Sequence, residues 1–223
     1  MFTGIIASTG VVRELSRKQT DVRLTVDVGK LDMSDVALGD SIATNGVCLT
    51  VVAFDSQSFS ADVSAETIAR SGFAHYSIGQ RVNLEKAMLP TSRFGGHIVS
   101  GHVDGVGEIQ SIEDHGKAVE IWASAPIELA RYIAEKGSVT VDGVSLTINQ
   151  VDGHRFRLTL VPHTMQETII GDYQTGTRVN LEVDVIARYL ERLMLGDKAA
   201  HSEQKQDISL AFLAENGFLN KKR

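Results

Sequence analysis

The sequence predicts an all-β protein built from two tandem six-stranded barrels followed by C-terminal helices. Three observations support this fold class. The apolar runs are short, β-branched and interrupted by Gly, Asp and Asn; one phrase occurs twice; and a helical stripe of apolar residues appears only near the C-terminus. With 223 residues, the chain is long enough for two domains of about a hundred residues, each with a core of its own.

The repeat is the most informative feature. Asn-Gly-Val-Cys-Leu-Thr at 45–50 is followed 97 residues later by Asp-Gly-Val-Ser-Leu-Thr. The same offset relates further segments: 79–85 and 176–182, and 3–6 and 100–103. We therefore expect two copies of one domain, spanning 1–97 and 98–184, and a tail at 185–223.

Each copy of the phrase begins with Asn-Gly or Asp-Gly, dipeptides that accept positive φ at both central positions of a type I′ turn, so each is expected to open the second strand of a hairpin. Strand alternation puts Val47 and Leu49 on one face, and Cys48 and Thr50 on the other. The polar face suits the edge of a planar polar ligand. Alternatively, Thr is simply a good strand residue and a lone Cys a small buried hydrophobe.

In the first copy the predicted strands lie near 10–16, 21–28, 40–45, 47–54, 57–63 and 81–87. Short helical turns are predicted at 30–38 and 65–72, where strand alternation is absent. Six short strands favour a closed barrel, because closure removes the exposed edges of a small sheet.

The segment 86–96 is predicted to be a bridge between the copies. After the second copy, an amphipathic helix stopped by Gly196 is indicated by the stripe of Ile186, Tyr189, Leu190, Leu193 and Met194. A second stripe is formed by Ile208, Phe212, Leu213 and Phe218. These helices either pack on their own barrel or pair with the same helices of other subunits.

Composition excludes several classes. A net charge of −6 and a pI near 5.6 argue against a nucleic-acid partner. The single cysteine excludes an internal disulfide and a cysteine-based zinc site, and it fits a reducing compartment. Without a signal peptide or a long apolar run, the protein is expected to be cytoplasmic, to start as written and to have no membrane partner.

Familiar catalytic motifs are absent: there is no G-x-G-x-x-G, P-loop or G-x-S-x-G. His97 and His102 are five residues apart, which makes them a poor chelating pair on a strand or a helix, so no metal site is expected.

The two copies differ at matched polar positions: Asn45 against Asp142, Cys48 against Ser145, Ile5 against His102, and Gly39 against Lys136. Two similar sites that treat two copies of one ligand differently would suit a reaction between identical molecules. Drift after duplication also explains the differences, and from these residues alone it is the preferred interpretation.

Four stretches together resemble the α-type riboflavin synthase family: Met-Phe-Thr-Gly-Ile-Ile at 1–6, the phrase at 45–51, Gly-Gly-His-Ile-Val-Ser-Gly-His-Val-Asp at 95–104, and the phrase at 142–147. The resemblance runs from Met1 to about Asp184. It implies two six-stranded Greek-key barrels, each a lumazine-binding repeat, and a C-terminal helix that holds a homotrimer together.

The resemblance also implies a reaction. Two molecules of 6,7-dimethyl-8-ribityllumazine exchange a four-carbon unit to give riboflavin and 5-amino-6-(ribitylamino)pyrimidinedione, the last step of riboflavin biosynthesis, with no cofactor or metal. The active site would lie between the first barrel of one subunit and the second barrel of its neighbour. An association with lumazine synthase is left open. The alternative is a non-catalytic lumazine- or flavin-binding protein on the same fold.

Carried over by position, the first pocket comprises Gly4, Ile5, Ile6, Ser41, Cys48, Leu49, Thr50, Asp62, Val63, Ser64, Ala65, Glu66 and Thr67. The second comprises Gly101, His102, Val103, Lys136, Ser145, Leu146, Thr147, Leu160, Val161, Pro162, His163 and Thr164. For catalysis, we expect His102 to move protons near neutral pH and Cys48 or Ser145 to add to C7 of the acceptor ring. Asp142 and Lys136 are expected to orient groups or stabilise charge.

Overall fold

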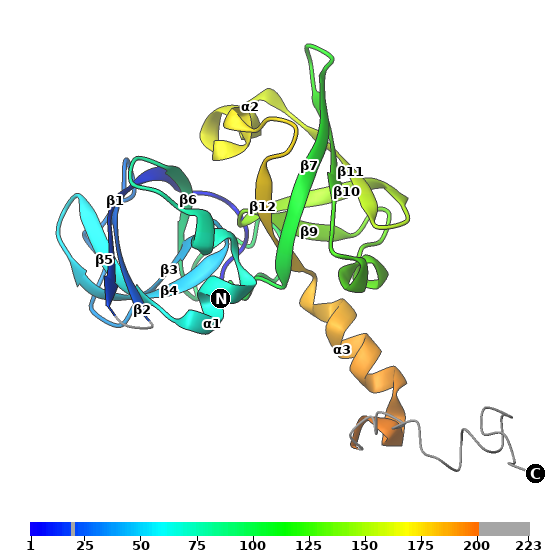
Figure 1. Cartoon of the computed structure of the whole chain (residues 1–223), viewed down its shortest axis with the longest axis horizontal. Helices are drawn as coiled ribbons and strands as arrows, with labels where there is room; N and C mark the ends of the chain where they lie inside the picture. The colour runs from blue at the N-terminus through cyan, green and yellow to red at the C-terminus, as the bar shows by residue number, and fades with distance from the viewer. Residues whose placement is uncertain (19–20, 201–223) are drawn as a thin grey trace, which may run out of the picture. The chain divides into compact units, whose positions relative to one another are not determined.

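The computed structural model describes residues 1–18 and 21–200, and its strands form two closed antiparallel barrels (Figure 1). The first barrel consists of β1 (Ser8–Lys18), β2 (Asp21–Asp27), β3 (Ser41–Thr44), β4 (Val47–Phe54), β5 (Ser58–Val63) and β6 (Arg81–Lys86). The second consists of β7 (Gly105–Asp114), β8 (Val119–Ser124), β9 (Ser138–Val141), β10 (Val144–Asp152), β11 (Arg155–Leu160) and β12 (Arg178–Val183).

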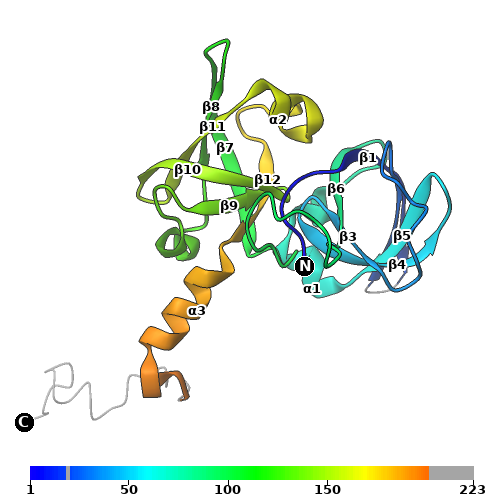
Figure 2. The same ribbon diagram turned by 180° about the vertical axis from the view of Figure 1, so that it is seen from behind.

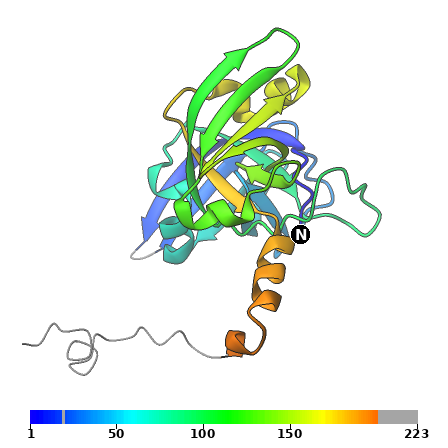
Figure 3. The same ribbon diagram turned by 90° about the vertical axis from the view of Figure 1, so that its right-hand side faces the viewer.

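The duplication extends to strand order and register. Around the first barrel the order is β1-β2-β5-β4-β3-β6, and adding six to each label gives the order of the second. The register shifts between Val12 and Glu14, and again 97 residues later between Ile109 and Ser111. The long β7–β8 hairpin, in green, extends past its barrel (Figure 3). The predicted all-β class with two six-stranded barrels is confirmed.

Both predicted type I′ turns are present. Asn45 and Gly46 have φ values of 46° and 77°, and Asp142 and Gly143 have values of 45° and 81°. These turns join β3 to β4 and β9 to β10, which sets the side-chain alternation of each second strand. The alternation is as predicted along β4, where Val47 is buried and Thr50 is exposed.

The helices that lie between strands are short. The predicted helical turn at 65–72 is confirmed by α1 (Ala65–Arg70) and the 3₁₀ helix η1 (Gly72–His75). The second copy has 3₁₀ helix η2 (Ile127–Tyr132), α2 (Pro162–Glu167) and 3₁₀ helix η3 (Ile169–Asp172).

The prediction of a helical turn at 30–38 is wrong. This segment forms separate turns, because Asp32 accepts a hydrogen bond from the backbone of Ser34 and Asp40 accepts one from Ala37. Side chain-to-backbone bonds of this kind compete with helix formation. The apolar side chains Leu31 and Met33 are buried instead in the core of the first barrel.

The predicted tail helix is confirmed as α3 (Val185–Met194), followed by 3₁₀ helix η4 (Gly196–Ala200). The second stripe, from Ile208 to Phe218, lies outside the described residues. Contacts divide the chain into compact units after Ala187, so the domain boundaries at 97 and 184 stay predictions. In the described part of the chain, no helix has the length and apolarity needed to span a membrane.

Candidate functional site

Each barrel presents a set of polar side chains on its outer face. In the first barrel, Ser41 pairs with Thr50, and Ala43 pairs with both Cys48 and Glu85. Residues paired directly across antiparallel strands share one face, so these side chains are neighbours. The second barrel repeats the set with Ser138, Thr147, Thr140, Ser145 and Glu182. Both predicted polar pairs, Cys48 with Thr50 and Ser145 with Thr147, therefore share a face with a carboxylate two strands away.

Two segments that precede the barrels meet between them. We call residues 2–6 and 99–103 the leading segments. They form an antiparallel bridge in which Phe2 N–H donates to Val99 O at 2.8 Å and Val99 N–H donates to Phe2 O at 3.2 Å. Figure 2 shows the start of the chain, in dark blue, where the barrels meet. Both Phe2 and Val99 are buried, so the bridge belongs to the interior.

From this bridge each leading segment reaches the barrel of the other copy. Ser145 N–H donates to Gly4 O, and Cys48 N–H donates to Gly101 O, each at 2.8 Å. Ile6 packs on the core of the second barrel, and Val103 packs on the core of the first.

The predicted grouping by sequence copy is therefore wrong for four residues. Gly4 and Ile6 lie with the second barrel, whereas Gly101 and Val103 lie with the first. The physical reason is the Phe2–Val99 bridge. After this bridge, each leading segment runs along the barrel of the other copy.

A buried glutamate of each barrel holds its own leading segment. Glu85 accepts hydrogen bonds from Thr3 N–H at 2.7 Å, Thr3 Oγ1 at 2.8 Å and Gly4 N–H at 2.9 Å. Burial raises the pKa of the Glu85 carboxyl, while these hydrogen bonds act in the opposite direction.

Glu182 repeats the arrangement in the second barrel. It accepts from the N–H groups of Ser100 at 2.7 Å, Gly101 at 3.0 Å and His102 at 3.1 Å. Burial raises the pKa of Glu182 to about 7. Sequence reasoning did not select these glutamates, although both end the repeated phrase Arg-Val-Asn-Leu-Glu.

His97 is a second residue that sequence reasoning missed, having considered it only as a metal ligand with His102. Its Nδ1 lies 2.8 Å from the Oγ of Ser145. The side chain is only 8% exposed, and burial lowers the pKa of the imidazole, so the ring is neutral at pH 7. Its Nε2 is buried without a hydrogen-bond partner among the described residues. A neutral imidazole in this position is able to accept the hydroxyl proton of Ser145.

Asp142 lies in the junction between the barrels and is only 4% exposed. Its carboxylate accepts from Asn180 N–H at 2.8 Å and from the Tyr173 hydroxyl at 2.6 Å. Its backbone carbonyl accepts from Asn83 Nδ2 of the first barrel at 2.9 Å. Burial raises the pKa of Asp142 to about 7. The residue is thus bonded within the junction, apart from the polar pair at Ser145 and Thr147.

Asn45 is the matched residue, with nearly the same partners. Its Oδ1 accepts from Asn83 N–H at 2.7 Å, and its Nδ2 donates to the Tyr76 hydroxyl at 2.7 Å. Its carbonyl accepts from Asn180 Nδ2 at 2.9 Å. Asn45 therefore donates to a tyrosine hydroxyl, whereas Asp142 accepts from one. The difference between the two residues reverses the direction of the tyrosine hydrogen bond in the junction.

The remaining predicted residues are dispersed. Lys136 is exposed in the turn before β9, with φ of 64°. Asp62 is exposed and pairs with Arg23. Ser64 caps α1, and its Oγ accepts from Thr67 N–H at 3.2 Å. At the matching strand end of the second barrel Leu160 is buried, Thr164 is half-buried, and Val161, Pro162 and His163 are exposed.

A hollow of about 500 Å³ lies beside the first barrel's polar face. Ile5 and Ser41 line it, together with Glu85, Lys86 and Met88. The hollow thus brings two predicted substrate-binding residues together with the glutamate of the same barrel.

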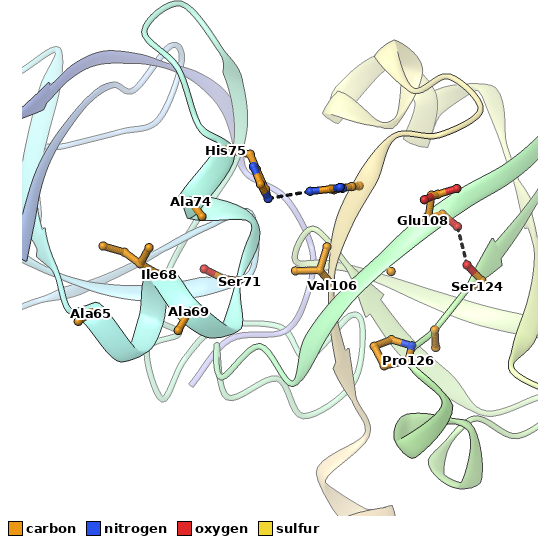
Figure 4. A pocket seen from close by; sticks show the side chains of 13 residues that line it. Ala65, Ile68, Ala69, Ser71, Ala74, His75, Val106, Glu108, Ser124 and Pro126 are labelled. Carbon is orange, nitrogen blue, oxygen red and sulfur yellow. Dashed lines mark hydrogen bonds between the residues drawn. The ribbon is translucent and has the colours of Figure 1, made fainter.

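A larger groove of about 700 Å³ lies between α1–η1 of the first barrel and β7–β8 of the second (Figure 4). Apolar side chains such as Ile68, Val106 and Pro126 line it, and Arg178 Nη1 donates to His75 Nε2 at 2.7 Å on its border. Ala65 is its only predicted site residue, so this groove does not gather the polar pairs.

Comparison with known proteins finds the lumazine binding domain family twice, at residues 3–87 and 100–184. The chain is 54% identical over 219 residues to a riboflavin synthase of Photobacterium phosphoreum, with 98% of this chain and 100% of that protein covered. It is 44% identical over 218 residues to a riboflavin synthase of Bacillus subtilis, again with 98% and 100% covered.

Solved structures of LumP share the fold. The complex of LumP with riboflavin superposes with a TM-score of 0.76 at 23% identity, covering 82% of this chain and 99% of that one. The complex with 6,7-dimethyl-8-(1'-D-ribityl) lumazine gives a TM-score of 0.74 at the same identity and coverage. At this identity the likeness establishes the two-barrel architecture.

Proposed function

The chain belongs to the riboflavin synthase family, and we propose that it converts two molecules of 6,7-dimethyl-8-ribityllumazine into riboflavin and 5-amino-6-(ribitylamino)pyrimidinedione. One molecule donates a four-carbon unit and the other accepts it, so the reaction requires two sites for one compound. The observation that carries the proposal is the duplicated outer face. Both barrels retain a hydroxyl or thiol, a threonine and a buried glutamate at matched positions, including Ser145 beside His97.

The contact with His97 supports Ser145 over Cys48 as the nucleophile. In the proposed step, Ser145 Oγ bonds to C7 of the acceptor ring, its proton passes to Nδ1 of His97, and an electron pair of the ring moves onto the pyrimidine portion. Cys48 instead packs with Phe2, Ala43 and Val99 in a small apolar cluster.

This assignment places the acceptor at the second barrel and the donor at the first. The donor loses a proton from its C7 methyl group, which requires a base nearby. We assign this role to His102, because its neighbours Gly101 and Val103 contact the first barrel while its own side chain is exposed. Lys136, also exposed, remains a candidate for stabilising charge on a bound ring.

The predicted homotrimer is part of the proposal. The apolar stripe of α3 is uncovered in the single chain: Ile186, Tyr189, Leu190, Leu193 and Met194 are between 54% and 87% exposed. An apolar stripe of this kind suits pairing with another subunit. With the site shared between subunits, the first barrel of one would face the second barrel of its neighbour. We further propose a cytoplasmic location, which suits the free thiol of Cys48. Association with lumazine synthase stays a prediction.

The test is to incubate the purified chain with the lumazine and to follow riboflavin by absorbance and fluorescence. Steady formation of riboflavin is the expected result. Tight binding of lumazine without turnover would instead identify a non-catalytic binding protein on the same fold.

A further inference from the structure

We infer that Glu85 and Glu182 are positioning residues that act crosswise, so that each carboxylate orders the polar pair of the other barrel. Glu85 of the first barrel would order Ser145 and His97, and Glu182 of the second barrel would order Cys48. The effect on turnover rests on the proposed function, whereas the structural coupling does not.

The first step is the anchoring of each leading segment. Glu85 and Glu182 are both buried, and each accepts three hydrogen bonds from its own segment. Hydrogen bonds to an ionised carboxylate are stronger than neutral ones, and their loss leaves buried donors unpaired. Each leading segment is therefore anchored to its own barrel through one carboxylate, in addition to the Phe2–Val99 bridge between the segments.

The second step is the transfer of that position to the other barrel through one glycine. Gly4 N–H donates to Glu85, and the Gly4 carbonyl accepts from Ser145 N–H at 2.8 Å. Gly101 N–H donates to Glu182, and its carbonyl accepts from Cys48 N–H at 2.8 Å. One residue thus links a glutamate of one barrel to the strand of the other.

Each of the two glycines is packed closely against the strand residue that it contacts. Both glycines have positive φ, 77° at Gly4 and 80° at Gly101. A Cβ built on Gly4 would lie 2.6 Å from Ser145 Cβ, and one built on Gly101 would lie 2.7 Å from Cys48 Cβ. Backbone packed this closely transmits a displacement to its neighbour.

Glu85 is also connected to His97, the base of the proposed pair, through Thr3. The carbonyl of Thr3, whose N–H and hydroxyl are held by Glu85, accepts from His97 N–H at 3.2 Å. Both members of the His97–Ser145 pair are therefore bonded to the segment that Glu85 anchors. Glu182 in turn accepts from the N–H of His102, the base proposed for the donor, so the loss of either glutamate is expected to lower kcat.

Amide hydrogen exchange on the full-length protein tests the coupling without substrate. In Glu85→Gln we expect exchange at Ser145 to quicken about tenfold while Cys48 changes little, since a looser hold on Gly4 weakens the bond that the Gly4 carbonyl accepts from Ser145 N–H. Glu182→Gln should give the reverse pattern. Glu14→Gln, an exposed change on β1, is the control and should alter neither amide.

Two milder variants keep the test decisive if a glutamine variant fails to fold. Thr3→Val removes one of the three bonds to Glu85, and Glu85→Asp keeps the charge with a shorter reach. Both should quicken exchange at Ser145 in the same direction but by a smaller factor. Faster exchange confined to the strand of the mutated barrel, or equal at Ser145 and Cys48, would overturn the inference.

Kinetics give a second readout. Glu85→Gln should lower kcat more than it raises KM and should shift the pH profile, with partial rescue in Glu85→Asp. A structural role alone would lower the amount of folded enzyme and leave the pH profile unchanged. If the wild-type chain makes no riboflavin, the proposed function fails, and the exchange pattern still decides the coupling.

Discussion

The Nδ1 atom of His97 lies 2.8 Å from the Oγ atom of Ser145, although 48 positions separate the two residues in the chain. The contact forms because His97 lies two residues before Val99 of the second leading segment and its N–H donates to the Thr3 carbonyl of the first. Burial keeps the imidazole neutral, which leaves one ring nitrogen free to accept a proton. The pair therefore has the composition of a hydroxyl nucleophile and its base.

Replacing the base should slow turnover. We expect His97→Gln to lower kcat about 100-fold with little change in KM, in line with the loss of a general base. Steady-state kinetics from pH 5.5 to 8.5 should also show that the acidic limb of the profile disappears. His115→Gln, an exposed change near the tip of the β7–β8 hairpin, is the control and should behave as wild type. Full activity in His97→Gln would remove the residue from the mechanism.

The two candidate nucleophiles can be separated by parallel substitutions. Ser145→Ala should lose activity by about the same factor as His97→Gln, since the two act as a unit. Cys48→Ser should retain most of its activity, because the thiol packs in an apolar cluster. A Cys48→Ser enzyme as inactive as Ser145→Ala would restore the thiol as the nucleophile.

The buried carboxyl group of Asp142 is expected to make the stability of the folded chain depend on pH. Because the pKa of Asp142 is raised to about 7 in the folded chain, the folded state binds more protons than the unfolded state above pH 4. Its contribution to stability is present below the unfolded pKa and is lost as pH rises through about 7. Each pKa unit corresponds to about 1.4 kcal/mol.

Asp142→Asn should therefore gain stability relative to wild type as pH rises from 5 to 8. An amide is compatible with these surroundings, because Asn45 at the matched position of the first copy donates through its Nδ2 to the Tyr76 hydroxyl. Urea unfolding at both pH values measures the difference, and Glu135→Gln is an exposed control. A difference that stays constant with pH would contradict the raised pKa.

Removal of the tail should change the oligomeric state. A chain that ends after Asp184 lacks α3 and its exposed apolar stripe, so we expect a monomer by light scattering where the full chain gives a trimer. Riboflavin formation should fall with the trimer, since the proposed site is shared between subunits. A truncated chain that remains trimeric would show that α3 is not the contact.

The fold could be predicted from the sequence because its signals are local. Asn-Gly and Asp-Gly fix the turns at 45–46 and 142–143 through backbone φ, and the constant offset of 97 makes the second barrel a copy of the first. The segment 30–38 was mispredicted because the side chains of Asp32 and Asp40 bond to nearby backbone, which a search for apolar periodicity does not detect.

The site was less predictable, because its decisive contacts join residues that are far apart in sequence. Nothing near Gly4 indicates that its carbonyl meets Ser145 of the other barrel. Asp142 was chosen for its charge, yet its neighbours place it in the junction with Tyr173 and Asn180. The repeated Glu85 and Glu182 were visible in the sequence, but their burial and their bonds to the leading segments became clear only in the folded chain.

The stoichiometry of the reaction tests the central claim most directly. Chromatography of a reaction started with lumazine alone should show two molecules of 6,7-dimethyl-8-ribityllumazine consumed for each riboflavin formed, with one molecule of 5-amino-6-(ribitylamino)pyrimidinedione released. Lumazine that is bound but recovered unchanged, or riboflavin formed without the pyrimidinedione, would contradict a transfer between two identical molecules.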